Sequence, residues 1–364
     1  MLAVGVIFGG RSGEHEVSIL SARSVIGALD RERYQVVPIG ITKEGHWLSP
    51  ERSQEMLNQD IESSPSAKVA PTPPYGDGSL WDGVSQLFGL DVVFPALHGP
   101  YGEDGTIQGL LETVGAPYVG AGVAASAIGM DKALMKAVFV KEGLPVVPYV
   151  VIRRSEWEER PLDTIKGIEA EVLYPCFVKP ASLGSSVGVS KVGSREDMGA
   201  ALDEASRWDR KLLVEKAVTA REIECGLLGN EYPQASVVGE IIPAREFYDY
   251  YAKYHDNRTQ LLIPASLPTE VAQRAQELAL RAYKAIDCSG MARVDMFLDK
   301  NDGQVYVSEI NTIPGFTSVS MYPKLWGASG VSYPALLDRL IDLALERHRE
   351  WKRALTAPLL ASKE

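Results

Sequence analysis

The most informative stretch of the sequence reads Lys179-Pro180-Ala181-Ser182-Leu183-Gly184-Ser185-Ser186-Val187-Gly188-Val189. Strand-like runs at 176–178 and 187–192 flank its centre, so we predict a strand, a loop and a second strand. Small residues leave backbone N–H groups free to surround phosphate oxygens, and Lys179 supplies a positive charge. We interpret the stretch as a phosphate-binding loop. A plain Gly/Ser hairpin turn is the alternative that the local sequence leaves open.

Two other loop types are compared with this stretch. A Walker loop needs GxxxxGK[ST] leading into a helix, and the chain has no such motif. Residues 184–188 do match the GxSxG elbow of serine hydrolases, with Ser186 as the nucleophile. That elbow needs a strand-to-helix turn, whereas 187–192 alternates like a strand. A hydrolase also needs a downstream histidine, for which only His255 and His348 are available. The serine hydrolase therefore stays an alternative to the phosphate loop.

The first 120 residues alternate short strand-like runs with helical patterns, which is typical of a parallel sheet with crossover helices. Residues 49–80 are rich in Pro, Ser and Gly, and we interpret them as an exposed excursion. The predicted strands are 4–8, 36–41 and 91–96, and the predicted helices are 17–29 and 106–114.

Strands dominate beyond residue 121. A helix at 124–142 is predicted to end at Gly143, and the amphipathic final helix, 333–353, is expected to pack on the outside of the last domain. The remaining prediction is a helix at 269–285 and strands at 146–152, 176–179, 187–192, 212–215, 222–228, 292–298 and 305–310.

Two polar pairs on the last two predicted strands suggest a metal site. Arg293 and Asp295 face one side of their strand, as do Glu309 and Asn311 on the next. A turn centred near 301–302 brings Asp295 opposite Glu309. The oxygens of Asp295, Glu309 and Asn311 then suit Mg²⁺ shared with a nucleotide phosphate. The alternative is an ordinary polar edge, on which Arg293 pairs with Asp295 or Glu309.

Composition narrows the class of protein. The chain has 364 residues, 45% of them hydrophobic, which suggests two or three domains. Its 37 basic and 48 acidic residues give a net charge of −11, which argues against nucleic acid as a partner. Cys176, Cys225 and Cys288 have neither disulfide-framework nor zinc-site spacing. No apolar run approaches the ~18 residues of a membrane span, and 2–8 is too short for a signal-peptide core. We expect a cytoplasmic protein without a membrane partner.

Together these features resemble the ATP-grasp superfamily and, within it, the D-alanine–D-alanine ligases. The resemblance covers nearly the whole chain. It implies an α/β and α+β fold of three domains: a parallel-sheet N-terminal domain (1–121), and a central (122–214) and a C-terminal domain (215–364) that sandwich ATP. It rests on the order and spacing of 9–18 (GGRSGEHEVS), 98–106 (HGPYGEDGT), 130–132 (MDK), the 179–188 loop, 252–254 (AKY), the two polar pairs and 311–318 (NTIPGFTS).

The resemblance also implies the nucleotide site. The segment 247–258 is expected to be a lid that closes on the nucleotide and brings Lys253 to the phosphates, with an ordinary surface loop as the alternative. For residues 215–218 a plain strand end is the alternative. The implied contacts are the phosphate lysines Lys132 and Lys179, the loop residue Ser186, the adenine hinge Glu215, Lys216, Ala217 and Val218, the ribose carboxylate Glu222, and the apolar walls Phe247 and Phe297.

The amino-acid site is implied in the same way. Glu14 matches the carboxylate that receives the ammonium of the first D-alanine, and a first-turn carboxylate favoured by the helix dipole is the alternative. Arg293 and the backbone N–H of Gly315 are implied to stabilise the tetrahedral oxyanion. The other implied residues are the hydroxyls of Ser185 and Tyr254, His98 with His15 and Glu103 in the same turns, and Ser320 and Met321 at the carboxylate of the second D-alanine. The family often has leucine in place of Met321.

The implied reaction is the ATP-dependent joining of two D-alanine molecules through an acyl-phosphate, for peptidoglycan precursor synthesis. The implied cofactor is a pair of Mg²⁺ ions, replaceable by Mn²⁺, and the implied assembly is a homodimer. Tyr254 favours D-alanine over D-lactate or D-serine as acceptor. An ATP-grasp ligase for another acceptor stays open, as does a catalytically silent nucleotide-binding protein. The intact set of Lys179, Arg293, Asp295, Glu309 and Asn311 argues against the silent protein.

Overall fold

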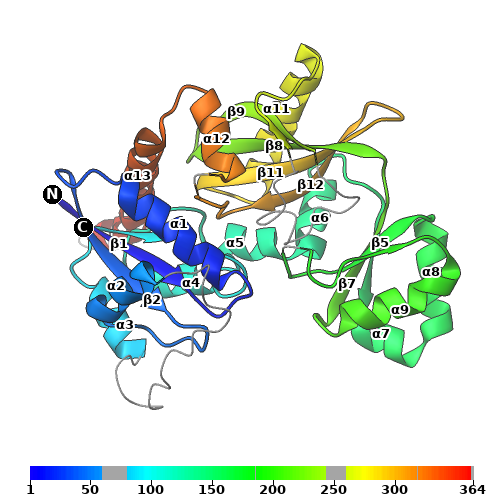
Figure 1. Ribbon diagram of the computed structural model, residues 1–364, viewed down its shortest axis with the longest axis horizontal. Coiled ribbons are helices and arrows are strands. Elements are labelled where there is room, and N and C mark those ends of the chain that lie inside the picture. The colour runs from blue at the N-terminus through cyan, green and yellow to red at the C-terminus, as the bar shows by residue number, and fades with distance from the viewer. Residues whose placement is uncertain (60–79, 185, 243–259, 318, 362–364) are drawn as a thin grey trace.

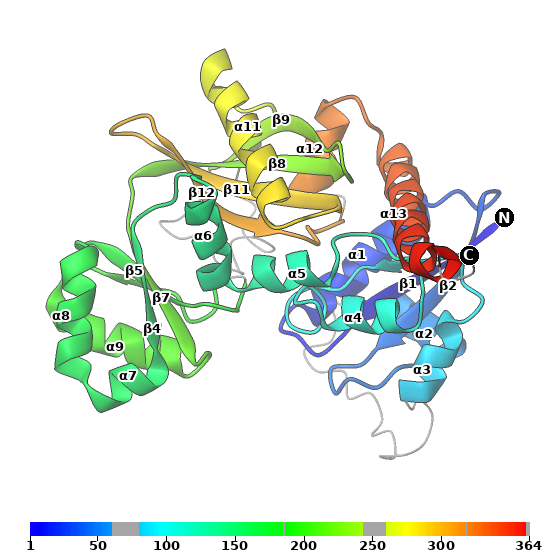
Figure 2. The ribbon, with the colours of Figure 1, turned by 180° about the vertical axis from the view of Figure 1, so that it is seen from behind.

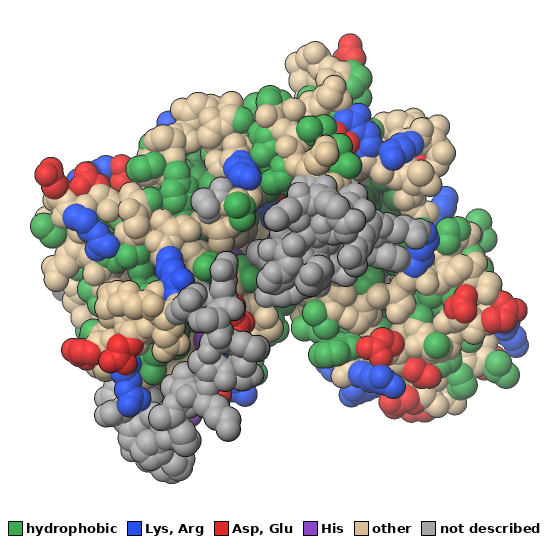
Figure 3. Space-filling model, in the orientation of Figure 1, with side chains coloured by type: hydrophobic (Ala, Val, Ile, Leu, Met, Phe, Trp, Pro, Cys, Tyr) green, Lys and Arg blue, Asp and Glu red, His purple; other side chains and the backbone are tan. Residues whose placement is uncertain are grey.

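The computed structural model describes residues 1–59, 80–184, 186–242, 260–317 and 319–361 (Figure 1). The described chain forms a three-stranded sheet in the order β2-β1-β3, a four-stranded sheet β4-β7-β5-β6 and a five-stranded sheet β10-β9-β8-β11-β12. Viewed from behind, helices α5 and α6 run between the lobes that these sheets form (Figure 2). Figure 3 shows a notch that separates the lobe of the four-stranded sheet from the three-stranded lobe.

The N-terminal sheet is parallel, as predicted. Its strands are β1 (Leu2–Gly9), β2 (Tyr34–Ile41) and β3 (Val92–Pro95), and its helices are α1 (His15–Ala28), α2 (Pro50–Asn58), α3 (Leu80–Leu87) and α4 (Thr106–Thr113).

The prediction that 49–80 is an exposed excursion is wrong at its start. Ser49 caps helix α2 by accepting a hydrogen bond from Arg52 N–H, and Met56 and Leu57 are buried in the N-terminal core. The sequence showed little sign of this helix, because Met56 and Leu57 are two apolar residues within a mostly polar segment. Residues 60–79 lie outside the described residues.

The predicted helix 124–142 is in fact two helices, α5 (Val123–Met130) and α6 (Lys132–Lys141). Asp131 is extended at the break, and its side chain accepts hydrogen bonds from the N–H groups of Ala133 and Leu134. A good N-cap residue therefore starts a new helix where the apolar periodicity suggested continuity.

The four-stranded sheet is antiparallel throughout. Its strands are β4 (Tyr149–Arg153), β5 (Cys176–Pro180), β6 (Ser190–Val192) and β7 (Lys211–Lys216). The helices α7 (Arg154–Glu159), α8 (Pro161–Glu171) and α9 (Arg195–Ser206), which the sequence did not predict, accompany it, and α8 and α9 share a hydrophobic core with one face of the sheet. The predicted domain boundary between 214 and 215 falls inside β7; the domain bounds stay a prediction.

The five-stranded sheet contains the predicted strands β8 (Ala220–Gly229), β11 (Gly290–Asp299) and β12 (Val305–Asn311), together with β9 (Gln234–Ile242) and β10 (Gln260–Leu262), which were not predicted. The predicted helix 269–285 is α11 (Thr269–Ala285), and its apolar side packs on this sheet. Helix α12 (Met321–Ala328) contacts β9 and β8.

The final helix, α13 (Tyr333–Ala361), is not confined to the outside of the last domain, so that prediction needs correction. Leu336, Leu340 and Ile341 lie in the same hydrophobic cluster as Val6 and Phe8 of β1. The helix therefore closes the N-terminal core, because its apolar side packs beside α1 and α2 against β1. Within the described ranges, no helix combines the length and apolar character that a bilayer crossing requires.

Candidate functional site

One face of the five-stranded sheet is polar. Asp295 on β11 pairs with Glu309 on β12, as predicted, and with Glu224 on β8. Arg293 pairs with Asn311 two residues along the ladder. Because side chains alternate along a strand, the residues between these face the apolar core on α11. The polar pairs therefore share one surface of the sheet.

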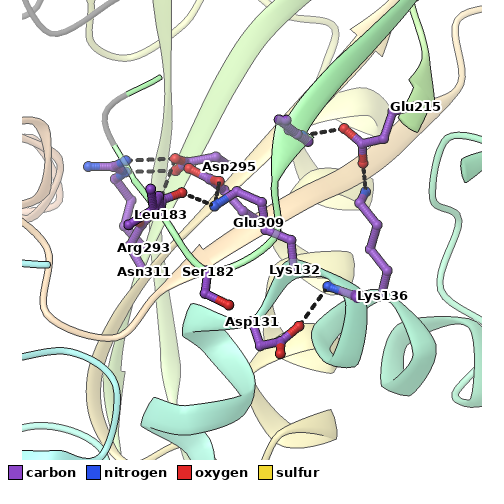
Figure 4. A network of polar contacts seen from close by, with 12 residues as sticks. Asp131, Lys132, Lys136, Ser182, Leu183, Glu215, Arg293, Asp295, Glu309 and Asn311 are labelled. Atoms are coloured by element: carbon purple, nitrogen blue, oxygen red, sulfur yellow. Dashed lines mark hydrogen bonds and ion pairs between the residues drawn. The ribbon is translucent and has the colours of Figure 1, made fainter. Parts of the chain in front are cut away.

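Arg293 is almost fully buried between two carboxylates. Its Nε and one terminal nitrogen each donate to Asp295 at 2.6 Å (Figure 4). Its Nε also lies 2.9 Å from Oε2 of Glu224. Burial alone lowers the pKa of Arg293, but Asp295 and Glu224 outweigh it and raise that pKa above its usual value. The predicted alternative, an Arg293–Asp295 pair, is thus present. Sequence reasoning missed Glu224, although its spacing from Glu222 repeats the i, i+2 pattern.

The donors around Asp295 fit a hard divalent cation. Asn311 Nδ2 donates to Asp295 Oδ2 at 3.0 Å, which holds the amide beside the carboxylate. In the described part of the chain no three His, Cys, Asp or Glu side chains are grouped to hold a metal. The candidate ligands are therefore two carboxylates, Asp295 and Glu309, and the Asn311 amide. A ligand set this small suits an ion that also binds phosphate oxygens and water.

Glu222 lies at the edge of the same acidic surface. Burial raises its pKa to about 7, and the nearby carboxylates of Asp295 and Glu309 add to the effect. Phe297 pairs with Glu222 across β8 and β11 and is half-buried, so it faces the same side. The predicted ribose carboxylate and one predicted apolar wall therefore lie together.

Lys132, the first residue of α6, connects this surface to the phosphate loop. Its Nζ donates to the carbonyl of Leu183 at 2.7 Å and lies 3.7 Å from Oε2 of Glu309 (Figure 4). The backbone N–H of Lys132 also donates to Ala181. A cation that touches both the loop and the acidic pair is well placed to contact a phosphate bound between them.

The phosphate loop connects two antiparallel strands, β5 and β6, as predicted, although β6 starts at Ser190 rather than 187. Ser186 is exposed and has a positive φ of 57°. No helix follows it directly, so the strand-to-helix context of a hydrolase elbow is absent. His348 lines a different cavity with Tyr118 and Arg347, and His255 lies outside the described residues. The serine hydrolase is not supported.

The predicted adenine hinge spans the end of β7: Glu215 and Lys216 are the last residues of the strand, and Ala217 and Val218 follow it. Glu215 is buried and forms ion pairs with Lys136 and Lys179. The N–H groups of Lys216 and Ala217 donate to the carbonyls of Pro148 and Pro175. Neither of these two N–H groups is therefore available to donate to a base. Sequence reasoning missed Lys136, which looks like an ordinary helix lysine.

A cavity of about 80 Å³ brings the separate motifs together. A Cβ on Gly184 would lie 3.9 Å from Oε2 of Glu14, so this carboxylate lies beside the phosphate loop. Residues next to each of the three sheets line this cavity, although they are far apart in sequence. The lining includes Glu14, His98, Glu103, Lys132, Gly184, Arg293, Glu309, Asn311 and Gly315.

His98 is held from both ring nitrogens. Nε2 lies 2.9 Å from Ser21 Oγ, and Nδ1 lies 3.2 Å from Glu103 Oε1. Burial raises the pKa of Glu103, although His98 opposes the shift. His15 instead bonds the carbonyl of Gly10 in its own turn, at 2.9 Å. The contacts with Ser21 and Glu103 therefore fix the orientation of the His98 ring where it lines the cavity.

Ser320 precedes α12 and is fixed by the preceding turn. Its Oγ accepts from Thr317 N–H at 3.1 Å, and a Cβ on Gly315 would lie 2.8 Å from the same oxygen. A side chain at 315 would therefore displace the Ser320 hydroxyl from this position. The side chain of Met321 is buried against Ile241 and Leu325, so a ligand can meet only its backbone. The predictions for Ser185, Phe247, Lys253, Tyr254 and the lid at 247–258 lie outside the described residues.

A strand–loop–strand phosphate loop facing an antiparallel sheet with paired acidic residues defines an ATP-grasp ligase. The family models described as D-ala D-ala ligase N-terminus and D-ala D-ala ligase C-terminus match residues 3–121 and 138–342. The chain belongs to the D-alanine–D-alanine ligase family. Ligases of this family use ATP and a divalent metal ion.

Individual relatives are similar over nearly their full length. A D-alanine–D-alanine ligase from Thermoanaerobacter sp. (strain X514) is 51% identical over 356 residues, 96% of this chain and 99% of the relative. The solved D-alanine–D-alanine ligase from Coxiella burnetii has a TM-score of 0.82 and 36% identity, covering 100% and 99% of the two chains. The VanG D-Ala:D-Ser ligase from Enterococcus faecalis has a TM-score of 0.78 and 35% identity, covering 94% and 99%.

Proposed function

We propose that this chain joins two D-alanine molecules into D-alanyl-D-alanine at the expense of ATP, for peptidoglycan precursor synthesis. The observation that carries the proposal is the shared cavity, in which Glu14 and His98 face Arg293, Gly315 and Lys132. A carboxylate for an ammonium, cations for phosphates and donors for an oxyanion are what such a ligation needs. The names of the relatives agree with this assignment.

The proposed reaction has two steps. In the first, a carboxylate oxygen of the first D-alanine takes the γ-phosphoryl group of ATP, and ADP leaves. In the second, the amine of the second D-alanine attacks the carbonyl carbon and loses a proton, and phosphate leaves. Glu14 holds the ammonium of the first D-alanine, while Arg293 and the N–H of Gly315 stabilise the oxyanion. Ser320 and the backbone of Met321 hold the carboxylate of the second D-alanine.

Lys132 and Lys179 bind the nucleotide phosphates in this proposal, and Glu222 binds the ribose. Asp295, Glu309 and Asn311 would hold Mg²⁺, replaceable by Mn²⁺, as a pair of ions. The metal would supply positive charge to the phosphate oxygens. The Asp295–Arg293 contact supports a role for Asp295 beyond packing, because its carboxylate is shared among the polar groups of the site.

The acceptor is the least constrained part of the proposal. A D-serine-accepting ligase is among the similar structures, so D-serine is the second candidate. Phosphate release is measured with ATP and Mg²⁺ and, in turn, D-alanine, L-alanine, D-lactate with D-alanine, and D-serine with D-alanine. We expect release with D-alanine alone and a D-alanyl-D-alanine mass in the product. Release that requires D-serine or D-lactate contradicts the acceptor assignment.

The metal assignment is tested with Asp295→Ala. We expect this variant to lose ATP turnover and to keep the circular dichroism spectrum of the wild type. Asn301→Ala, in the exposed turn after β11, is the matched control and keeps full turnover. Normal ATP turnover in Asp295→Ala contradicts the assignment of Asp295 as a metal ligand.

A cytoplasmic homodimer completes the proposal and rests on the family resemblance. Sedimentation equilibrium of the purified chain tests the dimer, and a monomer at assay concentration contradicts it. Fractionation of the source cells tests the compartment.

A further inference from the structure

Lys136 is a fully buried lysine beside the phosphate loop. Its side chain is 0% exposed, and its Nζ lies 2.6 Å from Oε1 of Glu215 (Figure 4). The other oxygen of Glu215 contacts Nζ of Lys179. The Lys136 ammonium also lies 5.8 Å from the centre of the Tyr149 ring. Two cations and one carboxylate thus form a buried chain, Lys136–Glu215–Lys179.

This chain follows from the register of the sheet and the pitch of one helix. Glu215 on β7 pairs with Tyr149 on one side and Phe177 on the other, and Lys179 lies two residues beyond Phe177 on the same face. Lys132 and Lys136 are one helical turn apart on α6 and therefore point to the same side. Helix α6 thus directs one lysine to the loop and a second to the carboxylate beneath it.

A buried ammonium is unfavourable unless it is paired. Burial lowers the pKa of Lys136, and Glu215 offsets part of that effect. Burial on its own raises the pKa of Glu215, but Lys136 and Lys179 reverse the shift and lower it to about 2. Glu215 is therefore ionised at neutral pH, and both lysines depend on the same carboxylate.

The three charges do not cancel. Two ammonium groups and one carboxylate leave one positive charge, which an anion can balance. The side chain of Lys179 is 15% exposed, whereas that of Lys136 is 0% exposed, so the anion reaches Lys179. If Lys179 turns from Glu215 to a phosphate, Lys136 still neutralises Glu215. Without Lys136, that movement leaves a lone buried carboxylate.

We propose that Lys136 is a positioning residue for the nucleotide: it balances Glu215 so that the charge of Lys179 is available to a phosphate. The inference rests on the proposed ATP site and adds a residue that none of the motifs contains. The competing explanation is that Lys136 only fills space in the core. The two explanations differ in whether removing the charge of Glu215 compensates for the loss of Lys136.

A double-substitution cycle tests the inference by calorimetric titration with ATP and Mg²⁺, without D-alanine. Lys136→Met leaves a neutral Lys179–Glu215 pair, and we expect the dissociation constant for ATP to rise at least about tenfold. Lys136→Met with Glu215→Gln restores one net positive charge, and we expect this double variant to bind ATP at least about threefold more tightly than Lys136→Met. Lys141→Met, in the exposed last turn of α6, is the control and binds as wild type.

Each outcome decides the inference. Wild-type affinity in Lys136→Met overturns it, as does a folded double variant that binds as weakly as Lys136→Met. If Lys136→Met is unfolded by circular dichroism, Lys136→Arg takes its place: retained charge predicts near-wild-type affinity, and a tenfold loss in a folded protein overturns the inference. Wild-type protein that binds no ATP overturns this inference and the proposed function. Binding of ATP without dipeptide synthesis overturns the proposed function alone.

Discussion

Glu224 holds Arg293 in place but is not one of the proposed metal ligands, so changing it tests the role of Arg293 separately from the metal site. It is 7% exposed and contacts Arg293, whose other carboxylate partner, Asp295, is a proposed metal ligand. We predict that Glu224→Gln lowers the free energy of unfolding by about 1–3 kcal/mol, because a buried cation loses one counter-charge. It also lowers kcat, because Arg293 is less firmly oriented. Urea denaturation and initial rates measure both effects. Glu231→Gln, an exposed control, leaves both unchanged; equal behaviour of the two variants contradicts the assignment.

The positions of Lys132 and Lys136 depend on where helix α6 begins, just after the break between α5 and α6. Asp131 caps α6 and forms an ion pair with Lys211 of β7, so it ties the helix start to the sheet. We predict that Asp131→Ala lowers the free energy of unfolding by about 1–2 kcal/mol through the lost cap. It also raises the KM for ATP, because Lys132 follows directly. Asp131→Asn keeps a capping oxygen and separates the cap from the ion pair. Denaturation curves and ATP titrations of both variants are the measurement; an alanine variant as stable as wild type rejects the cap.

At the scale of the whole molecule, Arg347 of α13 connects parts of the chain that are distant in sequence. Its guanidinium donates to the carbonyls of Gly120 and Tyr118 and to Ser289 Oγ, and lies 4.3 Å from the centre of the Tyr118 ring. A lysine has neither the planar fork nor the stacking surface for these contacts. We predict that Arg347→Lys lowers the melting temperature by a few degrees, roughly 1–2 kcal/mol at this size. Scanning calorimetry measures it, with the exposed Arg349→Lys as control. Identical melting of both variants contradicts the role.

Much of the fold and of the acidic pair could be predicted because the evidence is local. Strand β12 returns antiparallel to β11 after a short turn that pairs Leu298 with Val305, so the turn brings Asp295 close to Glu309. A register shift between Asp295 and Met296 makes the pairing direct, and the sequence did not predict that shift. Strands β5 and β6 likewise lie antiparallel on either side of the phosphate loop. Local patterns failed where a cap competed with periodicity, as at Asp131, and where a few apolar residues sat among polar ones, as at Met56 and Leu57 in α2.

By itself, the sequence determined the order of the motifs, the phosphate loop between two strands and the family to which the chain belongs. Only the tertiary structure decided that Lys136 balances Glu215, that Glu224 holds Arg293 and that α13 closes the N-terminal core. The physical reason is that the free energy of burying a charge, or the apolar side of a helix, depends on the groups that pack against it. Those neighbours come from segments far along the chain, where spacing and periodicity carry no information.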